Sequence, residues 1–417
     1  MATEKEIVII GGGIIGLCSA YYLQKSGHQV TIVDQSKMNS GASYINAGYL
    51  CPSHLIPLAA PGVMQQGLKW MFSDKSPLYI KPRLNPSFLK WTWAFNKSCT
   101  QKHVDQAIPI MGKIAVMGRD LYHTIKKEEG FDFQLEKKGL LMLCQTQETL
   151  HHELELVTAA QKEGLQAREV SAQEIQQMMP NARFNTVGGT YFESDHHTTP
   201  GEFMTNMIAH LKQAGVTFRT EEKVVDITVN DRKITAIQTD KEMLKADEFV
   251  LAAGSWTGTL SRKLNLSILL EAGKGYSMQT TNETGITYPS ILAEAKVAIT
   301  PMNGFTRFAG TMEIAGINHD INKKRVEAIA EGVQKSFPNV TISESEKANA
   351  VCGLRPVSPD GMPYIGKSKQ CKNLTIATGH AMMGWSLGPS TGKLVQEIID
   401  EVTPSMDLEM FHPDRKF

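Results

Sequence analysis

The chain has 417 residues, of which 41% are hydrophobic and 21% charged, so it is long enough for two hydrophobic cores and is typical of a globular protein. Its 43 basic and 43 acidic residues balance, which gives no support to a nucleic-acid-binding function. The six cysteines are scattered, without the spacing of a metal site or a disulfide framework, and they indicate reduced thiols in a cytoplasmic protein. No stretch of about 18 apolar residues occurs, so we expect no membrane-spanning helix.

The N-terminal segment predicts a nucleotide-binding βαβ unit. Residues 7–10 are apolar and β-branched, like a buried parallel strand, and Gly11-x-Gly13-x-x-Gly16 follows directly. A helix and a second strand come next, and Asp34 ends that strand 18 residues beyond the last glycine. Strand, glycines, helix, strand and acid occur together in the required order, which makes a glycine-rich turn without a ligand a poor alternative.

Each part of this motif has a physical task in dinucleotide binding. Gly11 permits the tight turn, Gly13 lets a pyrophosphate approach the backbone, and Gly16 lets helix and strand pack closely. The free N–H groups at the helix N-terminus, around Ile14, favour the phosphates. The Asp34 carboxylate can accept hydrogen bonds from a ribose diol. The motif alone fits either NAD or FAD.

Two segments after this unit are open to more than one interpretation. Residues 40–50 are mostly small, so their backbone can lie against a flat ligand, although a surface loop has similar composition. Residues 57–98 mix prolines, lysines and aromatic side chains, among them Trp91, Trp93 and Phe95. Such a mixture suits a bilayer interface, but tryptophans are usually mostly buried, which favours packing between domains.

The rest of the chain predicts alternating helices and strands. We expect helices over 103–127, 148–162, 172–179, from Pro200 to Gly215, and over 323–337. We expect strands over 139–143 and 187–192, an antiparallel series over 216–218, 224–229, 234–237 and 249–254, and further strands near 268–280, 288–300 and 305–312. Asp195-His196-His197 does not predict a metal site, because neighbouring residues on extended backbone point in opposite directions. The pattern indicates an α+β unit inserted into an α/β nucleotide domain.

Three segments that are far apart in the sequence make the functional interpretation more specific. They are 40–48, Leu251-Ala252-Ala253-Gly254-Ser255-Trp256, and Gly353-Leu354-Arg355-Pro356 with its continuation to Gly366, and the tail 377–387 extends them. Together they resemble the D-amino acid oxidase superfamily of FAD-dependent oxidoreductases over essentially the whole chain. Within this superfamily, the sequence is most similar to the bacterial D-amino acid dehydrogenase small subunits, over residues 46–62, 69–72, 274–277 and 379–385.

The resemblance implies a Rossmann-like FAD-binding domain built from 1–85, 196–261 and 351–417. It implies an interleaved antiparallel-sheet substrate domain built from 86–195 and 262–350. The residues that it would place on the FAD are Gly11, Gly13, Ile14, Ile15, Gly16, Asp34, Gln35, Ser40, Ala42, Ser43, Asn46, Ala47, Gly48, Leu50, Val224, Ala253, Gly254, Trp256, Gly379, His380, Met382, Met383, Gly384, Trp385 and Ser386. Backbone N–H groups of 379–386 would stabilise negative charge on the reduced flavin.

The resemblance also implies three catalytic residues. Arg355 stands where relatives bind the substrate carboxylate with a guanidinium fork. Tyr276 could add a hydroxyl to the same carboxylate, although core packing is nearly as good an explanation. Arg307 lies near the place of an oxygen-activating lysine in sarcosine oxidases. Ile45 occupies the position of a flavin-tethering histidine and Cys352 is one residue out of step with a tethering cysteine, so we expect non-covalent FAD.

The expected reaction is oxidative deamination of D-amino acids, with hydride transfer from Cα and electrons passed to a quinone or another acceptor. Alternatives are a dehydrogenase for D-proline or cis-4-hydroxy-D-proline, a glycine or sarcosine oxidase that makes hydrogen peroxide, and a flavoprotein subunit whose FAD is mainly structural. A carboxylate-binding arginine argues against the last of these. We expect a cytoplasmic location with possible contact to the inner face of the membrane, a small-molecule substrate, no nucleic acid and no metal.

Overall fold

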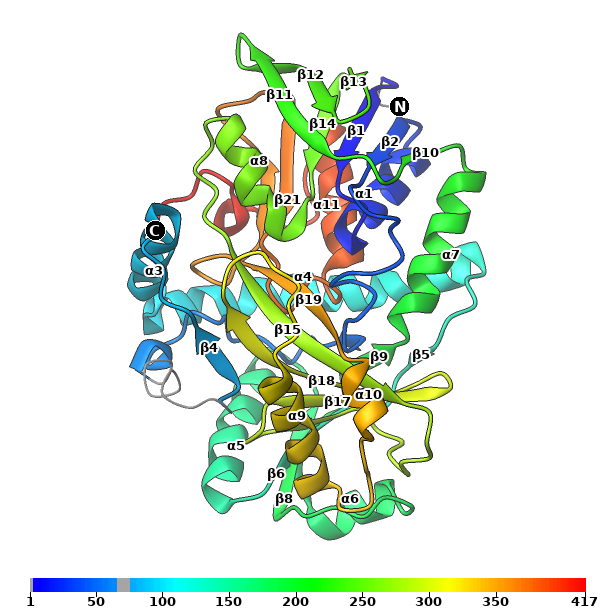
Figure 1. The fold of residues 1–417 in the computed structure, drawn as a ribbon, viewed down its shortest axis with the longest axis vertical. Coiled ribbons are helices and arrows are strands. Elements are labelled where there is room, and N and C mark those ends of the chain that lie inside the picture. The colour runs from blue at the N-terminus through cyan, green and yellow to red at the C-terminus, as the bar shows by residue number, and fades with distance from the viewer. Residues whose placement is uncertain (1–2, 66–75) are drawn as a thin grey trace.

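Two β-sheets stacked along the long axis organise the molecule (Figure 1). The computed structural model describes residues 3–65 and 76–417. Helix α4 (Gln101–Glu129) crosses the middle of the molecule between the two sheets. Thr100 caps its first turn by accepting a hydrogen bond from the His103 N–H, and Gly130 ends it in a left-handed conformation.

The first sheet has six strands, and we call it the nucleotide-side sheet. Its order is β10 (Thr217–Arg219), β2 (Gln29–Val33), β1 (Glu6–Ile10), β14 (Glu248–Leu251), β21 (Leu374–Thr378) and β20 (Tyr364–Lys367). All neighbours are parallel except β20 and β21. Because both faces are covered, its central strands are continuous apolar runs, as at Ile7 to Ile10. The predicted βαβ unit is confirmed, with α1 (Ile14–Lys25) between β1 and β2.

The prediction of one antiparallel series over 216–254 is wrong. β10 and β14 are parallel members of the nucleotide-side sheet, because each pairs with a strand far away in the sequence. Only the small sheet of β11 (Val224–Asn230), β12 (Lys233–Thr239) and β13 (Met243–Leu244) is antiparallel. It packs with α8 (Thr257–Lys263) on one face of the nucleotide-side sheet, while α1, α7 (Pro200–Gln213) and α11 (Gly388–Ile399) cover the other.

The second sheet is larger and mostly antiparallel, and we call it the substrate-side sheet. Its order is β19 (Val351–Val357), β15 (Glu271–Thr280), β18 (Phe305–Ile314), β17 (Val297–Met302), β16 (Ser290–Leu292), β6 (Leu140–Cys144), β8 (Gly188–Phe192) and β7 (Ala167–Ser171), with β4 (Leu78–Ile80) paired to β18. Helices α9 (Lys323–Ser336) and α10 (Glu344–Ala348) lie against one face. The other face looks towards the centre of the molecule.

The remaining elements complete the frame. Helices α5 (Gln147–Lys162) and α6 (Ala172–Met178) pack at the β6–β7 end, and a three-stranded sheet joins β3 (Tyr49–Leu50), β9 (His196–Thr198) and β5 (Leu135–Glu136). Short 3-10 helices lie at Gly254–Trp256 and Glu409–Phe411. The helices expected over 103–127, 148–162, 172–179, 200–215 and 323–337 are present within a few residues of their predicted ends. The expected strand over 288–300 is two strands joined by a turn.

Two strands from the ranges expected for the FAD-binding domain pair with the substrate-side sheet. β4 and β19 both lie in ranges assigned to the FAD-binding domain, yet they pair with β18 and β15 of the substrate-side sheet. β19 is therefore a strand of the substrate-side sheet, although its residues fall in a range expected for the FAD-binding domain. This placement matters because β19 carries Arg355.

Helix α3 (Pro86–Ser98) divides the aromatic residues of 57–98 between two environments. Trp91 and Phe95 are buried and stacked at 5.1 Å, and the Trp91 indole N–H donates to the Val357 carbonyl. Trp93 is 63% exposed, with the Lys97 ammonium 4.9 Å above its ring. The 69–72 segment lies outside the described residues. Within the described ranges, no helix combines the length and the apolar character that crossing a bilayer requires.

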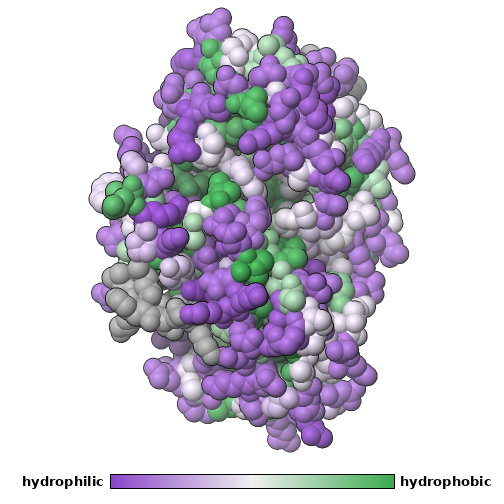
Figure 2. All heavy atoms as spheres, viewed as in Figure 1, coloured by the Kyte–Doolittle hydropathy of each residue, from purple (hydrophilic) through white to green (hydrophobic). Residues whose placement is uncertain are grey.

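The surface seen in Figure 2 is mostly hydrophilic. Apolar side chains form small separate patches across the middle of this face, near the level where the two sheets meet (Figure 2).

Candidate active site

A large cavity lies between the two sheets, with a volume of about 1170 Å³. Typical small-molecule pockets measure about 300–1,000 Å³, so this one has room for a dinucleotide together with a small substrate. Its wall comes from segments that are far apart in the sequence, chiefly 10–15, 33–47, 252–256, 353–356 and 377–386. These are the segments that carry the sequence resemblance.

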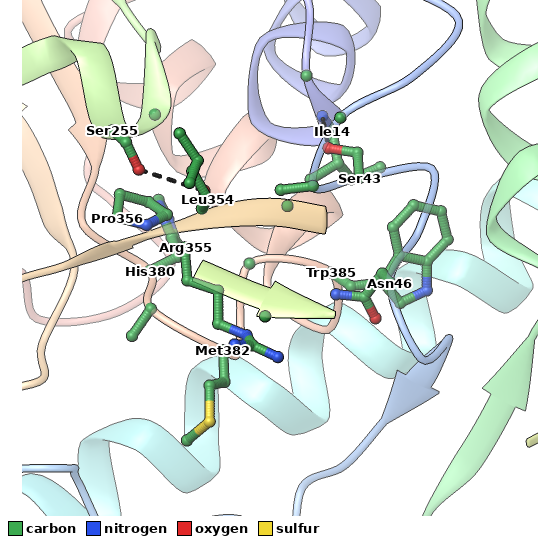
Figure 3. Close-up of a pocket in the computed structure, with 18 of the residues that line it drawn as sticks. Ile14, Ser43, Asn46, Ser255, Leu354, Arg355, Pro356, His380, Met382 and Trp385 are labelled. Atoms are coloured by element: carbon green, nitrogen blue, oxygen red, sulfur yellow. Dashed lines mark hydrogen bonds between the residues drawn. The ribbon is translucent and has the colours of Figure 1, made fainter. Parts of the chain in front are cut away.

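The β1–α1 turn forms one end of the cavity and has the geometry of a phosphate site. Gly11 has φ of 110°, and a Cβ there would collide with the Ala252 carbonyl. A Cβ on Gly16 would collide with the Gly11 carbonyl, so helix and turn pack as closely as the motif predicts. The Ser43 hydroxyl accepts a hydrogen bond from the Ile14 N–H at 3.0 Å, next to the helix N-terminus (Figure 3).

Asp34 lies at the same end and organises the turn as well as facing the cavity. One carboxylate oxygen accepts the Gly12 N–H at 2.7 Å, and the other accepts the backbone N–H and the hydroxyl of Ser36. Since each carboxylate oxygen has two acceptor sites, these bonds leave capacity for a ribose hydroxyl. The predicted ribose role therefore remains compatible with a structural one.

The loop 379–386 covers another wall and presents unused polar groups. The His380 ring is buried, its Nε2 lies 3.0 Å from the Thr391 hydroxyl, and its Nδ1 has no partner among the described residues. Burial lowers the pKa of His380 to about 3, so the ring is neutral. The backbone N–H groups of Met382 and Gly384 likewise find no acceptor in the described chain. An aromatic ring system bearing carbonyl and nitrogen acceptors would satisfy such donors.

These observations test whether FAD suits the cavity. The helix N-terminus fits a pyrophosphate, the turn glycines leave room for its approach, and the 379–386 loop offers donors to a flavin. Gly353 adds to the fit, because a Cβ there would approach the Ala42 Cα at 2.9 Å and narrow the wall. The donor set and the space therefore fit FAD.

Arg355 is the cationic centre of the cavity. Its side chain extends from β19 into the open space beside Met382 (Figure 3). Nη1 donates to the Thr311 carbonyl at 2.8 Å, and within the described chain the other guanidinium nitrogens have no hydrogen-bond partner. The guanidinium lies over Gly275, where a Cβ would collide with it. Burial lowers the pKa of Arg355 to about 10, which still leaves it charged at neutral pH.

Tyr276 and Arg307 have different surroundings from those that the resemblance implies. Because Gly275 faces Arg355, the adjacent Tyr276 points to the opposite face of β15. There its ring packs in the core below α9, and its hydroxyl donates to Glu313 at 2.9 Å. Arg307 donates to the backbone carbonyls of Tyr44 and Asn46 at 3.0 and 2.8 Å. It supports the 44–46 loop and is not among the residues that line the cavity.

Most of the predicted cofactor residues line the cavity. They are Gly11, Gly13, Ile14, Ile15, Asp34, Gln35, Ser40, Ala42, Ser43, Asn46, Ala47, Val224, Ala253, Gly254, Trp256, His380, Met382, Met383, Gly384, Trp385 and Ser386. Four others support the wall from behind: Gly16 and Gly379 pack against other backbone or ring atoms, Gly48 approaches the Thr198 carbonyl, and Leu50 is buried in the core. Trp385 contributes backbone to the cavity, because its indole is 1% exposed and donates to Thr198.

The structure also places Ile45 and Cys352, the two residues considered for a covalent bond to the flavin. Ile45 lines the cavity with an aliphatic side chain, which forms no covalent bond to a flavin. Cys352 is one residue before Gly353 and three before Arg355. Because side chains alternate along a strand, the Cys352 thiol points away from the cavity, towards the core on the α9 side. Its thiol lies 3.5 Å from the His319 carbonyl. Non-covalent FAD remains the prediction.

Sequence reasoning missed Cys51, His54 and Glu153 in this region, and it considered Asp195 only as part of a rejected metal site. Asp195 is fully buried and accepts both the N–H and the hydroxyl of Ser53, at 3.1 and 2.5 Å. Cys51 and His54 lie beside it, with possible ligand atoms of the three residues within 4.8 Å of one another. Glu153 of α5 reaches the same part of the cavity. Nothing in the local sequence brings the 51–54 segment to Asp195, since the contact depends on the pairing of β3 with β9.

Burial perturbs the titration of this group. It raises the pKa of Asp195 to about 7 and, with help from the Lys296 charge, lowers the pKa of His54 to about 4. At neutral pH His54 is therefore neutral, and Asp195 is near its midpoint.

Comparison with known proteins agrees with this geometry. Residues 6–398 match the family described as DAO, FAD dependent oxidoreductase. Among curated proteins, the D-amino acid dehydrogenase of Vibrio vulnificus is 33% identical over 401 residues, covering 94% of this chain and 95% of the relative. The D-amino acid dehydrogenase of Helicobacter pylori is 31% identical over 398 residues, covering 95% of each chain.

Solved structures show the same architecture. Glycine oxidase from Geobacillus kaustophilus superposes with a TM-score of 0.79 at 21% identity, covering 99% of each chain. L-proline dehydrogenase from P. horikoshii gives 0.75 at 18% identity, covering 99% of this chain and 98% of the other. At such identities the likeness shows the fold alone. From the family match over nearly its whole length and from a cavity suited to FAD, we conclude that this chain belongs to the DAO family of FAD-dependent oxidoreductases.

Proposed function

We propose that this protein oxidises D-amino acids to imino acids, which water then converts to 2-oxo acids and ammonia. The observation that carries the proposal is Arg355, a half-buried cation whose Nη1 is hydrogen-bonded to the Thr311 carbonyl and whose remaining nitrogens have no partner among the described residues. A carboxylate is the complementary anion for such a fork. The relatives named as D-amino acid dehydrogenases support the choice of substrate.

The chain's own residues would hold and orient the substrate. Arg355 would bind the carboxylate, and the flat floor at Gly275 would let Cα approach the loop 379–386. The substrate amine must be neutral when the Cα hydrogen leaves as hydride. A bound FAD supplies the two-electron oxidant for that hydride. No acid–base residue is required for the transfer itself, and orientation would account for much of the acceleration.

We further infer that the two sheets divide the work. The nucleotide-side sheet would hold FAD through the β1–α1 turn, Asp34 and the 379–386 loop. The substrate-side sheet would form the floor beneath the amino acid. Support comes from the lining of the cavity, which draws its glycine turns from the first sheet and Arg355, Gly275 and Thr311 from the second.

We propose a quinone as the electron acceptor, reached at a bilayer surface. Helix α3 supports this idea, because Trp93 and Leu89 are 63% and 53% exposed and lysines stand beside them. Co-sedimentation with anionic vesicles tests the contact. Equal sedimentation of the wild type and a Trp93→Ser, Leu89→Ser variant would count against it.

The activity is tested by anaerobic mixing of the purified flavoprotein with a panel of amines. The panel contains D- and L-amino acids, D-proline, cis-4-hydroxy-D-proline, glycine and sarcosine, and flavin absorbance at about 450 nm is followed. We expect bleaching by D-isomers, slow recovery in air and fast recovery with a quinone analogue. Fast recovery in air with peroxide would identify an oxidase. Absence of bleaching by any amine would refute the proposal and favour a structural flavin.

A further inference from the structure

We propose that the end of the cavity remote from Arg355 binds the side chain of the substrate, and that Glu153 selects an uncharged side chain carrying a hydroxyl or carboxamide. The inference rests on the proposed function, since it concerns the same amino acid. It names a specificity residue on α5, a helix that the family resemblance did not bring to the active site.

Glu153 is an unusual residue for its position. It is 1% exposed on an otherwise amphipathic helix, and it lines the cavity. Its Oε2 is buried and has no hydrogen-bond partner among the described residues, while Oε1 lies 3.8 Å from the Lys296 ammonium. Burial raises the pKa of Glu153. A buried polar atom without a partner costs free energy. We therefore infer that a bound ligand donates a hydrogen bond to Oε2 of Glu153.

The floor of the cavity leads from the carboxylate anchor to this carboxyl group. The residues of the substrate-side sheet that face the cavity are small near Arg355, at Gly275, Ala309 and Ala298. Farther across the sheet they are the larger apolar residues Ile291 and Met142. A substrate would therefore lie with its reacting carbon over the small residues and its side chain over the apolar ones.

The register of the strands shows that the two ends are within reach of one amino acid. Arg355 donates to the carbonyl of Thr311, which follows Gly310 on β18. Gly310 pairs with Val297 on β17, and Lys296 immediately precedes Val297. Neighbouring strands are about 4.8 Å apart, so the backbone of Lys296 begins one strand away from the strand that carries Thr311. From there the Lys296 side chain continues across the cavity wall to Glu153, at 3.8 Å.

The charges around Glu153 define which side chain fits. Lys296 offsets the carboxylate, and His54, which lines the cavity near Lys296, is neutral at neutral pH because burial and that ammonium lower its pKa to about 4. A cationic side chain would meet Lys296, and an anionic one would meet Glu153. An uncharged hydroxyl or carboxamide could donate a hydrogen bond to Oε2 of Glu153. It would be repelled by neither the Lys296 ammonium nor the Glu153 carboxylate.

The test compares substrates of similar size on matched variants. Glu153→Met removes the acceptor and keeps an apolar wall, and Glu155→Gln is the control, because Glu155 is exposed on the same helix. The rate constant of anaerobic flavin reduction divided by the apparent Kd is measured for D-glutamine, D-methionine, D-glutamate, D-lysine and D-alanine. We expect the wild type to prefer D-glutamine, and Glu153→Met to lower the D-glutamine to D-methionine ratio about 10- to 100-fold.

In that experiment D-alanine should react equally with Glu155→Gln and the wild type, and Glu153→Met should affect D-alanine less than D-glutamine, since a methyl group offers no hydrogen bond to Glu153. Calorimetry on the oxidised holoenzyme gives a readout without turnover: Glu153→Met should weaken glutaramate about tenfold or more and leave pentanoate unchanged. An unchanged D-glutamine to D-methionine ratio, or a wild type that prefers D-lysine, would overturn the inference. A flavin that no D-amino acid reduces, D-alanine included, would instead refute the proposed function.

Discussion

Replacing Arg355 tests the centre of the proposed mechanism. A bound carboxylate would gain two charge-assisted hydrogen bonds from the guanidinium, each of which is typically about 1.5–3 kcal/mol. Arg355→Met removes both and keeps a long side chain over Gly275. We expect a loss of roughly 3–6 kcal/mol, which corresponds to a fall of about 10²- to 10⁴-fold in the reduction rate constant divided by Kd.

Arg355→Lys should fall between this variant and the wild type. It keeps the charge but presents a single ammonium, which cannot bind Thr311 and both carboxylate oxygens with the same geometry. Anaerobic stopped-flow reduction with increasing D-amino acid separates binding from hydride transfer, and the FAD content of each variant is measured after denaturation. Arg355→Met with full FAD and less than a tenfold loss would refute the assignment of the carboxylate site.

Three further predictions follow from the surroundings of single residues. Tyr276→Phe should change the substrate Kd less than threefold and lower the free energy of unfolding by about 1 kcal/mol, because the Tyr276 hydroxyl bonds to Glu313. A tenfold rise in the substrate Kd would instead support a contact between Tyr276 and the substrate carboxylate. Arg307→Met should weaken FAD binding about tenfold in a fluorescence titration, since the loop it supports loses two hydrogen bonds, and wild-type affinity would contradict this. Asp195 has its pKa raised from 3.8 to about 7, so the folded chain keeps a proton that the unfolded chain loses in this interval, and stability falls as the pH rises. Urea unfolding should show a loss of about 3 kcal/mol between about pH 5 and 8 that Asp195→Asn lacks, and parallel curves for the two proteins would disprove it.

Structural features that are determined by residues adjacent in the sequence could be predicted. The turn from Gly11 to Gly16 specifies its own backbone, and the helix and strands beside it follow from their apolar pattern. Arg355 was found because the residues on both sides of it carry the family resemblance. Its placement in the cavity agrees with that expectation.

Features that depend on pairing between distant segments could not be predicted in the same way. The parallel partners of β10 and β14 lie at the N-terminus, and nothing local distinguishes them from an antiparallel series. The orientation of Tyr276 depends on the phase of β15, whose pairing with β18 shifts register between Lys274 and Tyr276. A shift of one residue exchanges the two faces of a strand, so the sequence left open whether Tyr276 reaches the substrate or packs in the core, where the structure places its ring.

Glu153 illustrates a different limit. In the sequence it belongs to a helix rich in glutamates, where a charged residue is normally solvated. Only the packing of α5 against β6 and β8 reveals that one of these glutamates is buried.

The order in which the strands of the nucleotide-side sheet occur in the chain bears on how the protein is made. β1 and β2 leave the ribosome before the other strands of this sheet, and β14, which pairs with β1, follows only after more than half of the 417 residues. The loop 379–386, which lines the cavity, emerges after every strand of the two sheets. β1 and β2 can pair with each other early, but the edge of β1 that later receives β14 has to wait for that strand, since non-local pairing is slow. We therefore expect FAD to be captured only after residues 379–386 have emerged, which makes the supply of free FAD at that stage a determinant of folding yield.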